Sequence, residues 1–189
     1  EVASFLAFAQ ENSSEESFPL FDVGDKAPGE AAHKVLNIAE IKKPPVSPAK
    51  AASKIGVSVF RWDFPDEVSG IYVFQDNKAS IGVNRNHPYV RQRFSIAHEL
   101  GHHVFHRENE LFMDFYDLDI TSNVYRPVEQ QRETRANQFA ADLLMPMSWI
   151  GKDFRKYGEQ NLSKLAHEYE VSEQAMWFRL LNLNLVEEQ

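Results

Sequence analysis

The segment 97–103 has the residue types and the spacing of a zinc-binding helix. It reads AHELGHH, so His98 and His102 are four residues apart and Glu99 directly follows the first histidine. Residues four apart on a helix lie one turn apart on one face, where both imidazoles can bind one Zn²⁺ at about 2.0–2.1 Å. Glu99 is then placed to take a proton from a zinc-bound water, whose pKa the metal lowers toward about 7.

A catalytic zinc usually takes a third protein ligand and leaves one position for water. The chain has no cysteine, so only histidine and carboxylate side chains are plausible ligands. The candidates are His87, His103, His106, Glu129, Glu133 and Asp142. The same ligand types also serve Mn²⁺ and Fe²⁺, so zinc is the expected metal and these two are alternatives.

Glu133 is favoured among these candidates because it opens a second helix. Asn137 follows one turn later, where its amide could hold a ligand histidine in its working tautomer. On spacing alone, a solvated carboxylate at a helix N-terminus explains Glu133 equally well. An oxyanion formed during hydrolysis also needs a hydrogen-bond donor, for which His103, Tyr125 and Arg126 are the candidates.

Two predicted helices would carry these side chains. Helical periodicity over 90–107 turns Phe94, Leu100 and other apolar residues toward a core, and a second helical pattern runs over 129–145 until Met145-Pro146 ends it. Before them, residues 57–62, 70–74 and 79–83 have the composition of strands, with turn chemistry at 76–78. We therefore expect an α+β fold with a small antiparallel sheet of about three strands, in which 79–84 forms an exposed edge able to hold an extended peptide.

The paired motifs RQRFSIAHELGHHVFH and ETRANQFAADLLMP resemble those of the ImmA/IrrE family of zinc metallopeptidases, and the similarity runs from about Ala31 to the end of the chain. The resemblance implies that His98, His102 and Glu133 bind zinc and that Glu99 is the catalytic base. It also implies endoproteolysis of a partner helix-turn-helix transcriptional repressor, which derepresses mobile-element or stress-response genes. On this basis we expect a helical, zincin-like core beside the sheet.

Three regions are expected along the chain. Residues 1–30 include a stretch rich in Ser, Glu, Pro and Gly, which predicts an irregular arm. Residues 31–150 form the predicted metallopeptidase domain, in which Ser47 and Pro48 start a short helix that ends near Lys54. Residues 151–189 form a helical subdomain with helix-turn-helix-like spacing, in which Ser172 caps the second helix.

The charge of the chain separates the remaining functional classes. The net charge is −8, and the second C-terminal helix offers only Arg179 as a basic residue, so direct binding to nucleic acid is unlikely on electrostatic grounds. The alternative function is a DNA-binding or protein-binding regulator, or a toxin–antitoxin component, that binds zinc without proteolysis.

No apolar run approaches the about 20 residues that span a bilayer, and residues 1–9 lack the basic start of a signal peptide. We therefore expect no membrane partner and a reducing cytoplasm.

Overall fold

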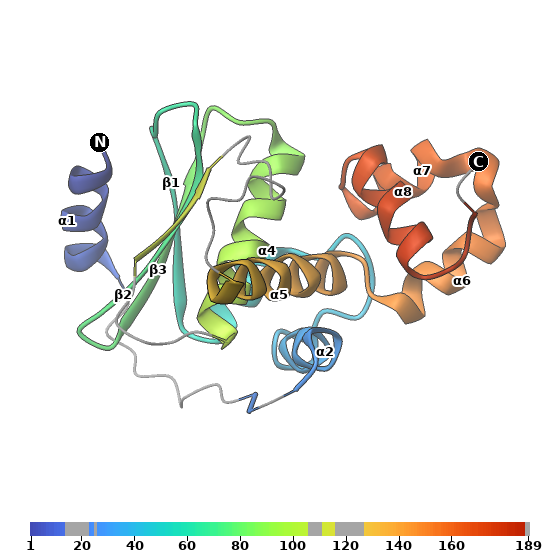
Figure 1. Ribbon diagram of the computed structural model, residues 1–189, viewed down its shortest axis with the longest axis horizontal. Coiled ribbons are helices and arrows are strands. Elements are labelled where there is room, and N and C mark those ends of the chain that lie inside the picture. The colour runs from blue at the N-terminus through green and yellow to red at the C-terminus, as the bar shows by residue number, and fades with distance from the viewer. Residues whose placement is uncertain (14–22, 25, 106–110, 116–126, 188–189) are drawn as a thin grey trace.

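The computed structural model describes residues 1–13, 23–24, 26–105, 111–115 and 127–187. Its helices are α1 (Val2–Asn12), α2 (Pro28–Ile38), α3 (Pro48–Lys54), α4 (Tyr89–Phe105), α5 (Pro127–Leu144), α6 (Met147–Tyr157), α7 (Leu162–Tyr169), α8 (Glu173–Asn182) and a 3₁₀ turn, η1 (Glu159–Asn161). Its strands are β1 (Val57–Trp62), β2 (Val68–Gln75), β3 (Lys78–Asn84) and β4 (Leu111–Phe115). The sheet stands between α1 and the helical layer (Figure 1).

The β2–β3 hairpin has the turn that the sequence predicts. Gln75 pairs with Lys78, and the two residues between them, Asp76 and Asn77, have φ values of 52° and 61°. Asn and Asp tolerate this left-handed region better than other residues that carry a side chain. The turn therefore sets the register of the hairpin that packs against α4.

The α+β class is confirmed, whereas the sheet is mixed and not wholly antiparallel. The strand order is β1-β3-β2-β4 among the described residues, with β1 parallel to β3 and with β2 antiparallel to both of its neighbours. Alternating polarity reveals which face of a strand is buried, but it does not reveal the neighbouring strand. The expectation that 79–84 forms an edge is wrong, because β3 lies between β1 and β2.

Helix α1 corrects the prediction of an irregular arm over 1–30. Val2–Asn12 is helical, and α2 already begins at Pro28. Phe5 and Ala9, one turn apart, are buried against the face of the sheet opposite α4, with Phe64, Val68 and Ile71 (Figure 1). A Cβ added at Gly82 of β3 would lie 2.5 Å from Cζ of Phe5, so the missing side chain makes room for this ring.

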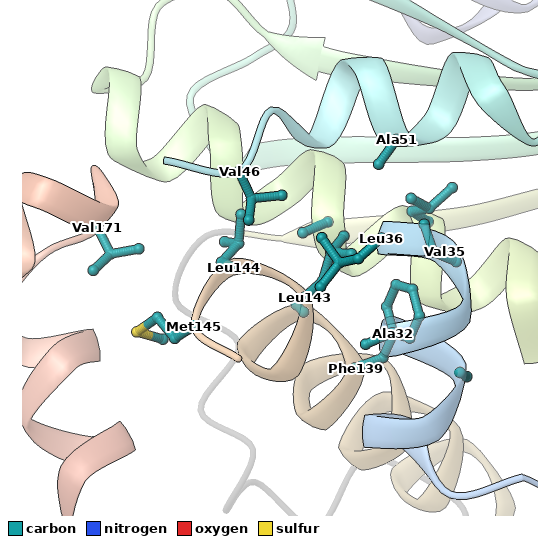
Figure 2. Packing of buried hydrophobic residues seen from close by; sticks show 14 of the residues in the cluster. Ala32, Val35, Leu36, Val46, Ala51, Phe139, Leu143, Leu144, Met145 and Val171 are labelled. Carbon is teal, nitrogen blue, oxygen red and sulfur yellow. The ribbon is translucent and has the colours of Figure 1, made fainter. Parts of the chain in front are cut away.

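The other face of the sheet joins the main core. Helix α4 packs on β2 and β3 and also against α5, and α5 packs against α2. Figure 2 shows Ala32, Val35 and Leu36 of α2 close to Phe139 and Leu143 of α5. This apolar contact fixes α5 beside α4 and so sets the distance between the two predicted metal-binding helices.

The C-terminal helices α6, α7 and α8 are tied to this core by buried arginines. Arg179 Nε donates to the carbonyl of Met145 at 2.9 Å and its guanidinium pairs with Asp142, while Arg93 of α4 bonds to carbonyls at both Val46 and Glu170. The Ser172 hydroxyl caps α8 by accepting from Ala175 N at 3.1 Å, as predicted. Arg179, the basic residue of α8, is only 8% exposed, so it is engaged inside the protein and is not free to meet a phosphate.

Within the part of the chain that the structure describes, no helix combines the length and the apolar character needed to cross a membrane.

Candidate metal centre

Helix α4 presents polar side chains on two neighbouring faces. His98 and His102 lie one turn apart and contact Glu133 of α5. Glu99 and His103, also one turn apart, lie toward β2, where a Cβ at Gly70 would touch Glu99 and where Tyr72 meets His103. All four side chains are buried, so these polar groups lie inside an otherwise apolar interface between the sheet and the helices. The first face holds the candidate metal ligands and the second holds the candidate base.

The three predicted ligands form a compact triangle. His98 Nε2 lies 3.1 Å from Glu133 Oε2, His102 Nε2 lies 3.3 Å from Glu133 Oε1, and the two Nε2 atoms are 3.1 Å apart. Ligands held at about 2.0–2.1 Å around a tetrahedral zinc are roughly 3.3 Å from each other. The donor set of two imidazoles and one carboxylate and its spacing therefore fit a divalent cation such as zinc.

The side chain of Glu133 is the most exposed of the three. It is 28% exposed, whereas those of His98 and His102 are 4% and 1% exposed. Partial burial raises the pKa of the Glu133 carboxyl, but in the metal-free protein its close contacts with the rings of His102 and His98 outweigh burial and hold that pKa well below its ordinary value. Glu133 is thus an anion at neutral pH, as a metal ligand must be.

Asn137 orients the first histidine. Its Oδ1 accepts a hydrogen bond from His98 Nδ1 at 2.8 Å, which places the proton on Nδ1 and leaves Nε2 directed at the triangle. Asn137 comes from α5, one turn after Glu133, as the sequence predicts for a residue that holds the tautomer. Helix α5 therefore supplies Glu133, a candidate ligand, and Asn137, the hydrogen-bond partner of the candidate ligand His98.

Replacing Asn137 with Ala is expected to weaken zinc binding about 10–100-fold, the effect typical of lost partners behind a metal-binding histidine. The variant leaves His98 Nδ1–H without this acceptor and frees the ring to turn. Competition with a chromophoric chelator measures the affinity. Asn137→Asp retains the acceptor and should stay within a few fold of the wild type, and an unchanged affinity in Asn137→Ala would contradict this role.

Helices α4 and α5 cross closely, and this crossing sets the distance between the two histidines on α4 and Glu133 on α5. A Cβ at Gly101 would lie 2.9 Å from Cα and 3.1 Å from the carbonyl oxygen of Ala136. These are backbone atoms, so the helices would have to move apart. Gly101 directly precedes His102 on α4, and Ala136 lies between Glu133 and Asn137 on α5. The absence of a side chain at Gly101 therefore lets the candidate ligands on the two helices approach one another.

The variant Gly101→Ala is expected to lose stability and metal affinity together. Overpacking of this kind typically costs about 1–3 kcal/mol, and separation of the helices would draw Glu133 away from both histidines. Thermal unfolding of the metal-free protein and chelator competition measure the two effects. Gly151→Ala is the matched control, because nothing lies within 4 Å of a Cβ at that position in α6. Wild-type metal affinity in Gly101→Ala would show that the crossing has no such role.

The other candidate ligands lie apart from the triangle or outside the described residues. His87 Nε2 bonds to the carbonyl of Asp66 at 2.8 Å, and Asp142 pairs with Arg179. Glu129 lies exposed in the first turn of α5. His106 falls outside the described residues, as do Tyr125 and Arg126, which were candidates for stabilising an oxyanion.

His103, the third oxyanion candidate, is placed against the sheet. Its Nδ1 lies 3.0 Å from the hydroxyl of Tyr72, which is fully buried in β2, and it is not part of the group that could hold an ion. Tyr72, Gly70 and Gly101 are not among the site residues expected from the sequence. The only sequence signal for the glycines is their occurrence inside a strand and a helix, which often marks a close approach.

Comparisons with known proteins agree with this arrangement. Residues 52–181 match the model of a peptidase family described as the IrrE N-terminal-like domain. A curated relative, the radiation response metalloprotease IrrE of Deinococcus radiodurans, is 34% identical over 92 residues. That alignment covers 48% of this chain and 27% of the relative, so the chain spans much less than the whole length of that protein.

The family match covers more than half of the 189 residues and includes both helices that carry the triangle. The sequence motifs, the contact between α4 and α5 and the family match lead to one assignment. The chain belongs to the ImmA/IrrE family of metallopeptidases.

Proposed function

We propose that this chain is a zinc-dependent endopeptidase in which His98, His102 and Glu133 hold the metal and Glu99 is the general base. The observation that carries the proposal is the triangle of two histidine nitrogens and a carboxylate, with sides of 3.1–3.3 Å, whose two histidines lie on the helix that also bears Glu99. A divalent cation in this triangle would polarise a peptide carbonyl and lower the pKa of a bound water. Mn²⁺ and Fe²⁺ are alternatives to zinc with the same ligands.

The chain's own residues supply the proton transfers. Glu99 takes the proton of the attacking water and then delivers it to the leaving amine. Its side chain is fully buried, so bulk water does not surround the carboxylate. Asn137 keeps His98 in the tautomer that a ligand needs. Both roles depend on α4 staying close to β2 on one side and to α5 on the other.

The proposed substrate is a helix-turn-helix transcriptional repressor in the cytoplasm, whose cleavage would release mobile-element or stress-response genes. Membership of a metallopeptidase family supports a protein substrate. The choice of a repressor rests on the resemblance to the ImmA/IrrE family, and the name of the curated relative, a radiation response metalloprotease, agrees with a stress response. We do not favour DNA binding through α8, the second helix of the helix-turn-helix-like pair, because its basic residue, Arg179, is buried in contacts with Asp142 and Met145.

The test is incubation of the zinc-loaded protein with the helix-turn-helix repressor encoded nearest to its gene, followed by mass spectrometry of the products. Discrete fragments that disappear when a chelator is added and return with zinc would support the proposal. An intact repressor, together with intact control proteins of the same class, would count against the peptidase function and favour a regulator that acts by association.

A further inference from the structure

Strand β2 contacts the face of α4 that carries Glu99. Gly70 and Tyr72 are two residues apart on β2 and therefore point to the same side of the sheet, toward α4. Glu99 and His103 are one turn apart on α4 and face them, with the hydroxyl of Tyr72 3.0 Å from His103 Nδ1. The candidate base is therefore packed against the strand.

Gly70 leaves the space that the Glu99 side chain fills. A Cβ built on Gly70 would lie 3.0 Å from Oε1 of Glu99, 3.2 Å from its Cγ and 3.5 Å from its Cδ. The first two distances are shorter than ordinary van der Waals contacts. Glu99 is fully buried, so its carboxylate has little room to move aside. Any side chain at position 70 must therefore displace either the carboxylate or the strand.

The backbone of β2 is irregular at this point. Its pairing with β4 shifts register between Val68 and Gly70, and bulges of this kind are frequent beside active sites, where they redirect the chain. Ser69, inside the irregularity, accepts a hydrogen bond from Arg91 Nη2 of α4 at 2.9 Å. The strand is thus tied to α4 next to Gly70, which makes displacement of the strand the harder of the two adjustments.

We propose that Gly70 is a positioning residue for the reaction: its missing side chain, on a strand held to α4 by Arg91, sets where the Glu99 carboxylate lies. This inference rests on the proposed function, because it assumes that Glu99 is the base. Gly70 acts through Glu99 and does not touch the metal ligands, which contact α5. The role therefore concerns the proton-transfer step and not the binding of metal.

Gly70→Ala is expected to lower kcat about 3–10-fold, because the Glu99 side chain must give way by a few tenths of an ångström and misplacement of a reacting group by 1 Å can cost about 100-fold. KM and zinc content should stay within about twofold of the wild type, because the triangle of His98, His102 and Glu133 is unchanged. The assay uses the zinc-loaded protein and the repressor named above. A crystal structure of the variant should show the Glu99 carboxylate moved away from β2.

Two glycine variants separate positioning from stability. Gly82→Ala introduces a Cβ 2.5 Å from the Phe5 ring on the opposite face of the sheet, so it should lower the melting temperature and leave kcat of the folded protein near the wild-type value. Gly151→Ala, with nothing within 4 Å, should change neither. A low kcat in Gly70→Ala at a melting temperature above that of Gly82→Ala would assign the loss to position 70 itself.

A kcat within twofold of the wild type in Gly70→Ala, an unmoved Glu99 carboxylate in its crystal structure, or a loss of zinc in parallel with kcat would each overturn the inference. If the wild type leaves the repressor intact, the proposed function fails separately. The crystal structure and the zinc content of Gly70→Ala still decide in that case whether position 70 sets the Glu99 carboxylate without disturbing the triangle.

Discussion

Replacing Glu99 with Gln should reduce peptide cleavage about 100- to 10,000-fold while one zinc per chain remains bound, because a positioned general base contributes that much to the rate. The amide has nearly the shape of the carboxylate but cannot take the proton of the attacking water. The ligands His98, His102 and Glu133 are unchanged. The measurement is the rate of repressor cleavage under single-turnover conditions, with metal content determined on the same sample.

Glu129→Gln is the matched control for this variant. It makes the same chemical change on an exposed residue in the first turn of α5, four residues before Glu133, and it should retain the wild-type rate. If Glu99→Gln keeps more than a tenth of the wild-type rate, another group takes the proton. If Glu99→Gln loses its zinc, the carboxylate holds the metal site together and its assignment as the base is wrong.

The second large effect is expected from Glu133→Ala, which should lose stoichiometric zinc and all cleavage. Two imidazoles remain, and the variant removes both the third ligand and the negative charge opposite them. Zinc affinity should fall by more than the about 10–100-fold expected for Asn137→Ala, because Asn137 only supports a ligand. Zinc at 100 times its dissociation constant stabilises a folded protein by about 2.7 kcal/mol, so the wild type should show a zinc-dependent rise in melting temperature that the variant lacks.

Glu129→Ala is the control for Glu133→Ala, since it removes a carboxylate from the same helix without touching the triangle. It should bind zinc as the wild type does. Zinc binding of wild-type strength in Glu133→Ala would mean that the third ligand lies elsewhere. In that case the segments outside the described residues, which include His106, would be examined first.

Much of the triangle could be predicted because its members are related by helical spacing. His98 and His102 follow from their separation of four on one helix, and the place of Asn137 one turn after Glu133 predicts that it holds a ligand histidine, which the structure identifies as His98. Spacing favoured Glu133, which has Asn137 one turn later, but it explained a solvated carboxylate at the start of the helix equally well. The resemblance to a family strengthened the choice, and the contact between α4 and α5 brings Glu133 to the histidines.

The features that could not be predicted depend on contacts between distant segments. The parallel pairing of β1 with β3 leaves no trace in the alternation of either strand. The role of Gly70 depends on Glu99 approaching from 29 positions further along the chain, and a glycine in a strand does not identify its neighbour. Helix α1 is short, and Phe5 is held by distant segments: its ring lies over Gly82 and against Trp62 and Phe64.

The central claim, that His98, His102 and Glu133 hold one metal ion, is tested most directly by the metal content of the wild-type protein purified without chelator. Elemental analysis by mass spectrometry should find about one zinc per chain, and Glu133→Ala prepared in parallel should contain almost none. A wild-type protein without stoichiometric zinc, manganese or iron, which also fails to take up zinc when it is supplied, would contradict the account.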